Sequence, residues 1–107
     1  MDAQEQRRLL ELAAKAAGMK ARYFADHWPG LKVFGDPRPW NPIDDDGDAL
    51  RLAIDLELDV SLGKSGAVVE FGRLQIEELD ASDPYAAVRL AIVRAAAAVG
   101  EKMGAKP

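Results

Sequence analysis

Apolar residues near the start of the chain recur with the spacing of one helix face. The stripe runs from Leu9 to Ala17, and the charged residues around it lie mostly on the other side. Asp2 followed by Glu5 has the spacing of a capping box, and Gly18 suits the left-handed residue that follows a helix. The pattern predicts a helix from about residue 3 to residue 17.

A second helical stripe, near the end of the chain, is the clearest in the sequence. Asp83 is typical of an N-cap and Pro84 of a first helical position. The stripe continues from Tyr85 to Met103, which predicts a helix over about 84–102. We expect a flexible tail over 104–107.

The middle of the chain carries two competing periods. The acidic run from Asp44 to Asp48 can accept the free amides at a helix start and faces the positive end of the helix dipole. From Ile54 to Leu62, however, apolar and polar residues alternate as in a half-buried strand. We therefore predict a helix over about 46–56 that is followed by a strand over about 58–62.

Two further strands are expected next. Residues 63–66 form a turn sequence, and the apolar run over 67–71 is rich in strand formers, so the chain forms a hairpin here. The alternation over 73–79 predicts a third strand, followed by a loop at 80–83.

Prolines and glycines interrupt residues 19–43, and proline lacks the amide hydrogen that helix interiors and central strands require. Residues 21–25 and 31–34 are predicted as short strands joined by a turn at 28–30. We expect an edge hairpin that leads into an irregular loop.

These elements predict one α+β domain over residues 1–107. We expect a single α/β/α sandwich-like domain with three helices and a small, mainly antiparallel sheet of three to five strands, with the first and last helices packed on the sheet. A chain of 107 residues has room for one core, and its 49% apolar and 30% charged residues are typical of a globular protein.

Several classes of protein are disfavoured. Without cysteine, the chain has no disulfide, thiolate metal site or cysteine nucleophile. Its start lacks the pattern of a signal peptide, and no stretch approaches the roughly 20 apolar residues of a membrane span. We therefore expect a cytoplasmic protein with no membrane contact.

Charge is unevenly distributed along the chain. The balance is +2 over residues 1–40, −9 over 41–83 and +3 over 84–107, for a net charge of −4. The middle third is either an acidic recognition face or a solvated surface that complements the basic ends. We favour the second interpretation, because runs of like charge are most often solvated surface.

Two features resemble binding motifs but lack their spacing. Residues 63–65, Gly-Lys-Ser, match the end of a phosphate loop, yet the motif's first glycine position holds Leu58 and a strand follows. The run from Asp44 to Asp48 offers oxygen ligands for calcium or magnesium, but the EF-hand spacing is absent. We predict no metal and no cofactor.

No catalytic arrangement is specified. His27 is the only histidine, which is weak support for a transition-metal site, and we predict an ordinary loop residue. Neither His27 with a carboxylate nor a pair from the acidic run has the spacing of an acid/base pair, and no serine lies in a nucleophile elbow. The sequence favours a protein without catalytic residues.

Candidate partner-binding residues surround the acidic run. Trp40 beside Asn41 is a common recognition pairing, although a ring that plugs the core explains Trp40 better. Arg89 can contact a partner or pair with an acidic residue of the second helix, and we favour the internal pair. The candidate contact residues are Trp40, Asn41, Asp45, Asp46, Asp48 and Arg89.

Residues 40–53, read as WNPxxDDGDALRLA, and residues 83–100, read as DPYAAVRLAIVRAAAAVG, resemble the phage ABA sandwich domain of small phage and prophage proteins. The first helix resembles it more loosely. The resemblance implies helix/sheet/helix layering and an origin in a phage or prophage, hence the cytoplasm of a bacterial host, and it implies no biochemical activity. Asp44 stands where the family more often has a hydroxyl residue, which argues against Asp44 as a required ligand.

Three functions stay open at this point. The first is a non-enzymatic phage or prophage accessory protein that binds a host or phage macromolecule, most simply a protein, through segment 44–59 and Trp40. The second is a small divalent-metal-dependent hydrolase that uses the Asp44–Asp48 cluster. The third, disfavoured by the net charge, is nucleic-acid binding through basic residues of the terminal helices. Those residues are Arg7, Arg8, Lys15, Arg89 and Arg94. The sequence does not specify an oligomeric state.

Overall fold

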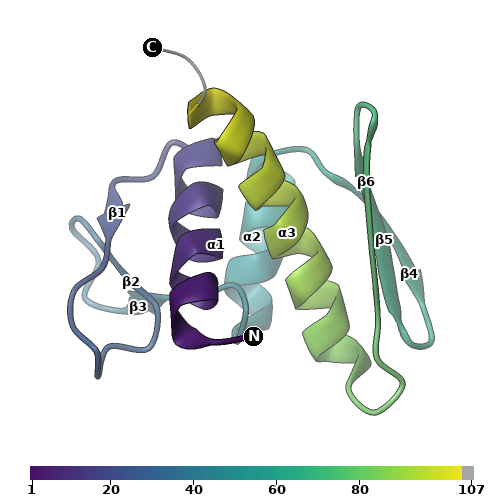
Figure 1. Ribbon diagram of the computed structural model, residues 1–107, viewed down its shortest axis with the longest axis horizontal. Helices are drawn as coiled ribbons and strands as arrows, with labels where there is room; N and C mark the ends of the chain where they lie inside the picture. The colour runs from purple at the N-terminus through teal and green to yellow at the C-terminus, as the bar shows by residue number, and fades with distance from the viewer. Residues whose placement is uncertain (105–107) are drawn as a thin grey trace.

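Three helices lie between two small antiparallel sheets in the computed structural model, which describes residues 1–104 (Figure 1). The helices are α1 (Ala3–Ala16), α2 (Asp46–Asp55) and α3 (Pro84–Gly104). One sheet contains β1 (Ala21–Arg22), β2 (Leu31–Val33) and β3 (Pro39–Trp40), and the other contains β4 (Asp59–Gly63), β5 (Gly66–Phe71) and β6 (Leu74–Leu79).

The α+β class, the three helices and the antiparallel strands confirm the prediction, and the sandwich description fits in general. The structure differs in its layers, because six strands form two sheets with the helices between them, in place of one sheet of three to five strands between helices. The strands are divided between two sheets because the helices separate them. Pro39–Trp40, expected in an irregular loop, adds a third strand to the predicted hairpin. The tail predicted over 104–107 lies outside the described residues except for Gly104, which ends α3.

The β4-β5-β6 sheet covers one side of α3. Val60 pairs with Val69, and Val69 pairs with Ile76, so these three side chains share the face that meets the helix. Val69 is fully buried. Alternate residues such as Ser61 and Glu77 lie on the opposite, exposed face, so the alternation of the sequence matches the two sides of the sheet.

The most extensive contact between helices joins α1 and α3. The buried face of α1 packs mainly against α3 and only lightly on the β1-β2-β3 sheet, which corrects the expectation that α1 lies on the sheet. Small residues allow a close approach, and a side-chain carbon at Gly100 would lie only 2.0 Å from the carbonyl oxygen of Leu12. Ala13 and Ala96 are fully buried in the core.

Side chains of aspartates begin all three helices. Asp2 accepts a hydrogen bond from the amide of Glu5 at 2.8 Å, which confirms the predicted cap of α1. Asp83 caps α3 in the same way and accepts a hydrogen bond from the amide of Ala86 at 3.1 Å.

Among residues 1–104, no helix is long and apolar enough to cross a membrane.

Candidate functional site

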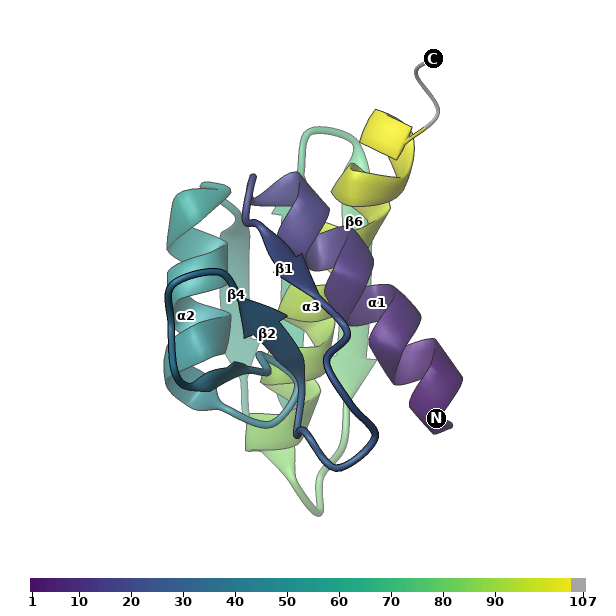
Figure 2. The ribbon, with the colours of Figure 1, turned by 90° about the vertical axis from the view of Figure 1, so that its left-hand side faces the viewer.

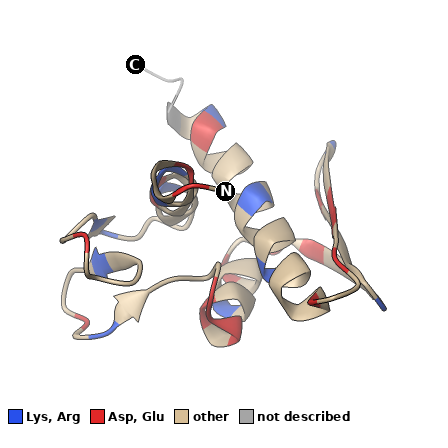
Figure 3. Cartoon of the chain, turned by 60° about the horizontal axis from the view of Figure 1, so that its bottom comes forward, with Lys and Arg blue, Asp and Glu red and all other residues tan. Residues whose placement is uncertain are grey.

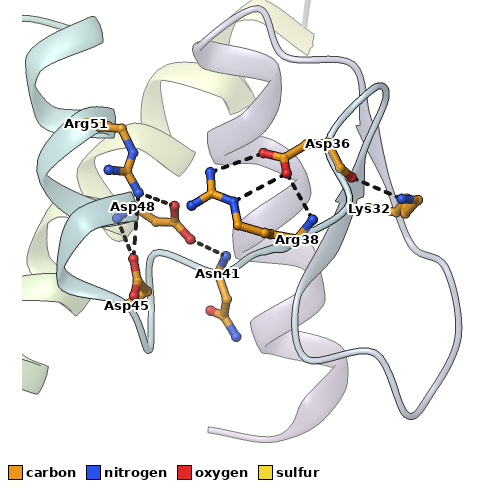
Figure 4. A network of polar contacts seen from close by, with 7 residues as sticks. All are labelled: Lys32, Asp36, Arg38, Asn41, Asp45, Asp48 and Arg51. Carbon is orange, nitrogen blue, oxygen red and sulfur yellow. Dashed lines mark hydrogen bonds and ion pairs between the residues drawn. The ribbon is translucent and has the colours of Figure 1, made fainter.

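The acidic run at the start of α2 is built into a polar network (Figure 4). Asp45 is the N-cap and accepts the amide of Asp48 at 2.8 Å. The side chain of Asp48 accepts one hydrogen bond from the backbone amide of Asn41 at 3.0 Å and another from a guanidinium nitrogen of Arg51 at 2.8 Å. Asp48 is 8% exposed and the one buried charged residue of the described chain. These contacts hold the loop before α2 against the helix.

Trp40 and Asn41 have structural roles next to this network. Trp40 is 8% exposed, so its ring packs in the core and does not form a recognition surface. The Asn41 side chain accepts the amide of Ile43 at 3.1 Å and donates to Asp44 at 3.2 Å, which shapes the turn between β3 and α2.

Arg89 joins α3 to the start of α2. Its Nε donates to the carbonyl oxygen of Ile43 at 2.7 Å, and its Nη1 lies 2.7 Å from a carboxylate oxygen of Asp46. The Arg89 side chain is 16% exposed, whereas that of Asp46 is 69% exposed, so water still reaches the ion pair from the Asp46 side. The predicted internal pair is confirmed, and Arg89 is not free for a partner.

Most carboxylates of the acidic run lie beside guanidinium groups. Among residues 1–104, no three side chains of histidine, cysteine, aspartate or glutamate are placed to hold a metal ion together. Asp45 and Asp48 both approach Arg51, at 3.8 and 2.8 Å, and Asp46 approaches Arg89. Guanidinium groups therefore neutralise carboxylates that the hydrolase hypothesis needs as ligands.

Basic side chains of the terminal helices also lie beside carboxylates. Arg8 forms an ion pair with Glu101 of α3, and Arg94 Nε lies 2.9 Å from Glu78 of β6 without the alignment of a hydrogen bond. Figure 3 shows basic and acidic positions interspersed on the helices. Arg8 and Arg94 therefore each have a carboxylate neighbour that competes with a phosphate backbone.

A further polar cluster lies in the β2–β3 loop. The backbone amide of Arg38 donates to Asp36 at 2.9 Å, and its guanidinium group lies 3.3 Å from the same carboxylate. The pKa of Asp36 is lowered most by the hydrogen bond from the Arg38 backbone amide and next by the hydrogen bond from the Arg38 side chain.

His27 is an exposed loop residue whose ring lies edge-on to Phe24, consistent with the predicted ordinary role.

The structure contains an apolar groove that the sequence analysis missed. The groove, which we call the α2–β4–α3 groove, has a volume of about 570 Å³ and is open to solvent. Its lining comes from three elements: Asp46, Ala49, Leu50 and Ala53 of α2; Val60, Leu62, Gly63 and Lys64 at β4; and Pro84, Tyr85, Val88, Arg89 and Ile92 of α3.

Large apolar side chains surround this groove in an exposed state. Leu50 is 60% exposed, Leu62 72% and Tyr85 70%. Ile54, one helical turn after Leu50, is 63% exposed and continues the apolar side of α2. The periodicity of the sequence placed these residues on apolar faces, but it gave no signal that a neighbouring element fails to cover them.

The groove has few polar groups. Asp46 and Arg89 pair with each other, which leaves Lys64 as the one charged lining residue without an ion pair among the described residues.

Comparisons of the chain with models of protein families, with curated proteins and with solved structures find no match.

Proposed function

We propose that this chain is a non-enzymatic accessory protein that binds a macromolecular partner through the α2–β4–α3 groove. The observation that carries the proposal is the ring of exposed Leu50, Leu62 and Tyr85 around an open apolar groove. Large apolar groups gathered on a surface mark sites of protein contact, because their burial by a partner is favourable.

The chemistry of the lining favours a protein over a nucleic acid. Leucine, isoleucine, valine and tyrosine side chains bury well against apolar protein segments, and tyrosine is common at binding hot spots. A phosphate backbone needs several cations, and Lys64 is the one unpaired cation of the lining.

The two stretches that resemble the phage ABA sandwich domain support a phage or prophage origin. That origin puts the protein in the cytoplasm of a bacterial host, where its partner is a host or phage protein.

The test is capture of partners from a bacterial lysate by three forms of the tagged protein, with and without nuclease. The L50S/L62S double variant removes apolar contacts of the groove. The matched control is L79S, because Leu79 is 63% exposed but lies outside the groove. We expect a nuclease-resistant partner whose affinity falls by about tenfold or more in L50S/L62S, since each buried leucine contributes about 1 kcal/mol or more.

The control should bind the same partner as strongly as the wild type. Equal capture by all three forms would refute the groove as the binding site. Capture that nuclease abolishes would favour nucleic-acid binding instead.

A further inference from the structure

The groove is bordered by a strand with an open edge. β4 pairs with β5 alone, so its other side carries no strand (Figure 1). Figure 2 shows β4 on the α2 side of its sheet and β6 on the α1 side. The open edge of β4 therefore lies beside the groove and not beside the α1–α3 contact.

The register determines which backbone groups point to this edge. A two-residue turn joins Gly63 to Gly66, so these residues form a hydrogen-bonding pair, and such pairs alternate along the strands. Ser61 is the next residue of β4 that bonds to β5, which leaves the amides and carbonyls of Val60 and Leu62 pointing outward. The β5–β6 hairpin, closed by the Phe71–Leu74 pair, gives β5 the same alternation.

No hydrogen bond within residues 1–104 occupies these outward groups. The loop and turn hydrogen bonds of the described chain include none to the backbone of Val60 or Leu62. The other edge of the sheet is better protected, because β6 carries Glu77 and Glu78, whereas β4 has a single charged residue, Asp59, at its first position. β4 is therefore the edge that is more open to a further strand.

The side chains beside this edge fit an extended segment. Val60 and Leu62 line the groove from β4, with Leu50 and Tyr85 among its lining residues from the helices. In a strand added to β4, every second side chain points to the same face as Val60 and Leu62. Apolar residues at those positions enter the groove, and the residues between them face solvent.

Charges mark the two ends of the open edge. Asp59 begins β4 and Lys64 follows its last residue, and neither has an ion pair within the described part of the chain. A segment that runs antiparallel to β4 meets Lys64 first and Asp59 last. It is therefore matched by an acidic residue at its start and a basic residue at its end.

We infer that the partner contributes an extended segment that adds to the open edge of β4, with alternate apolar residues in the groove, an acidic residue beside Lys64 and a basic residue beside Asp59. The inference rests on the proposed function and specifies the form of the partner. Main-chain hydrogen bonds supply the pairing, and the groove supplies the selection of side chains.

The first test compares L62P with L62A. Both variants remove the leucine side chain, but only proline removes the outward amide, and an edge strand tolerates proline at such a position. The probe is a fluorescent peptide with the core Glu-Thr-Val-Thr-Val-Lys between glycine linkers. We expect weaker binding to L62A than to the wild type and about threefold or more further loss in L62P, with thermal melts to check folding.

A charge exchange provides the second test. The D59K/K64E variant should prefer the peptide with its terminal charges exchanged, Lys-Thr-Val-Thr-Val-Glu, by about twofold to tenfold, because both cross-strand pairs are then restored. An unchanged preference would overturn the charge assignment and, with it, the direction of the strand.

Other outcomes separate this inference from the proposed function. Two outcomes would overturn strand addition and leave the groove as a binding site. In the first, L62P and L62A bind the peptide equally. In the second, the wild type binds no peptide, although its capture of the lysate partner is lost in L50S/L62S. A dimer in sedimentation that persists in L62A and dissociates in L62P would mean that a second copy fills the edge, which also overturns the inference.

Discussion

The contact between Gly100 and Leu12 gives a strong prediction about stability. A Cβ atom at Gly100 would lie 2.0 Å from the carbonyl oxygen of Leu12 and 2.8 Å from its carbonyl carbon, against an ordinary contact of 3.4–4 Å. Because the obstacle is backbone, α1 and α3 must move apart by about 1 Å or more, and a gap of that size loses about a quarter to a half of the local dispersion energy.

We expect G100A to lower the free energy of unfolding by about 2 kcal/mol. Overpacking costs about 1–3 kcal/mol, and a main-chain clash belongs at the upper end, while the better helix propensity of alanine returns about 1 kcal/mol. The assay is denaturation by urea followed by circular dichroism. The melting temperature should fall by about 10 °C in a domain of this size.

G47A is the matched control, because Gly47 also lies in a helix. A Cβ there would meet the guanidinium nitrogens of Arg51 at 3.0 and 3.2 Å and a carboxylate oxygen of Asp45 at 3.2 Å. All three atoms lie at the ends of side chains, which need to shift by only a few tenths of an ångström. We expect G47A to be neutral or to stabilise the fold by about 0.5 kcal/mol. A G100A protein as stable as the wild type would refute the reasoning about the helix contact.

Three further predictions concern single residues. Glu57 follows α2 with φ 55°, a left-handed conformation that glycine adopts without strain, so E57G should raise the melting temperature and stabilise the fold by about 1 kcal/mol. D48A leaves the backbone amide of Asn41 without its acceptor and should lower the free energy of unfolding by about 1–3 kcal/mol in urea denaturation. The lowered pKa of Asp36 implies a stabilising contribution that is present above its unfolded pKa and is lost as pH falls through its folded pKa. NMR titration of the Asp36 carboxyl carbon should show that this pKa rises in R38A. It should stay below the ordinary value, because the backbone amide of residue 38 still donates to the carboxylate.

Local sequence patterns predicted the elements well because their causes are local. Asp83 and Pro84 specify the start of α3 by capping and by a fixed backbone angle, and the helix begins there. The change from helical to alternating period between Ile54 and Leu62 was predicted as a helix followed by a strand. The structure places the change at Glu57, where the chain leaves α2 before β4.

The groove and the division of the strands depend on distant residues and could not be predicted in this way. Periodicity places Tyr85 and Val88 on one apolar stripe, yet Tyr85 is 70% exposed because no element within residues 1–104 covers the beginning of α3 on that side. The acidic run also depends in part on distant residues. Its cap was predictable from Asp45, but its ion pairs depend on Arg51 and Arg89, and only the pair to Arg89 was predicted, as one of two alternatives.

The contact between the first and last helices affects the order in which the protein folds. Arg8 and Glu101 form an ion pair across 93 positions of sequence, and the apolar face of α1 is buried mainly by α3. During synthesis, α1 therefore leaves the ribosome long before the helix that covers it exists, and its leucines stay exposed until α3 has been made. The contact between α1 and α3 closes only after that, and apolar surface that is exposed in the meantime favours aggregation.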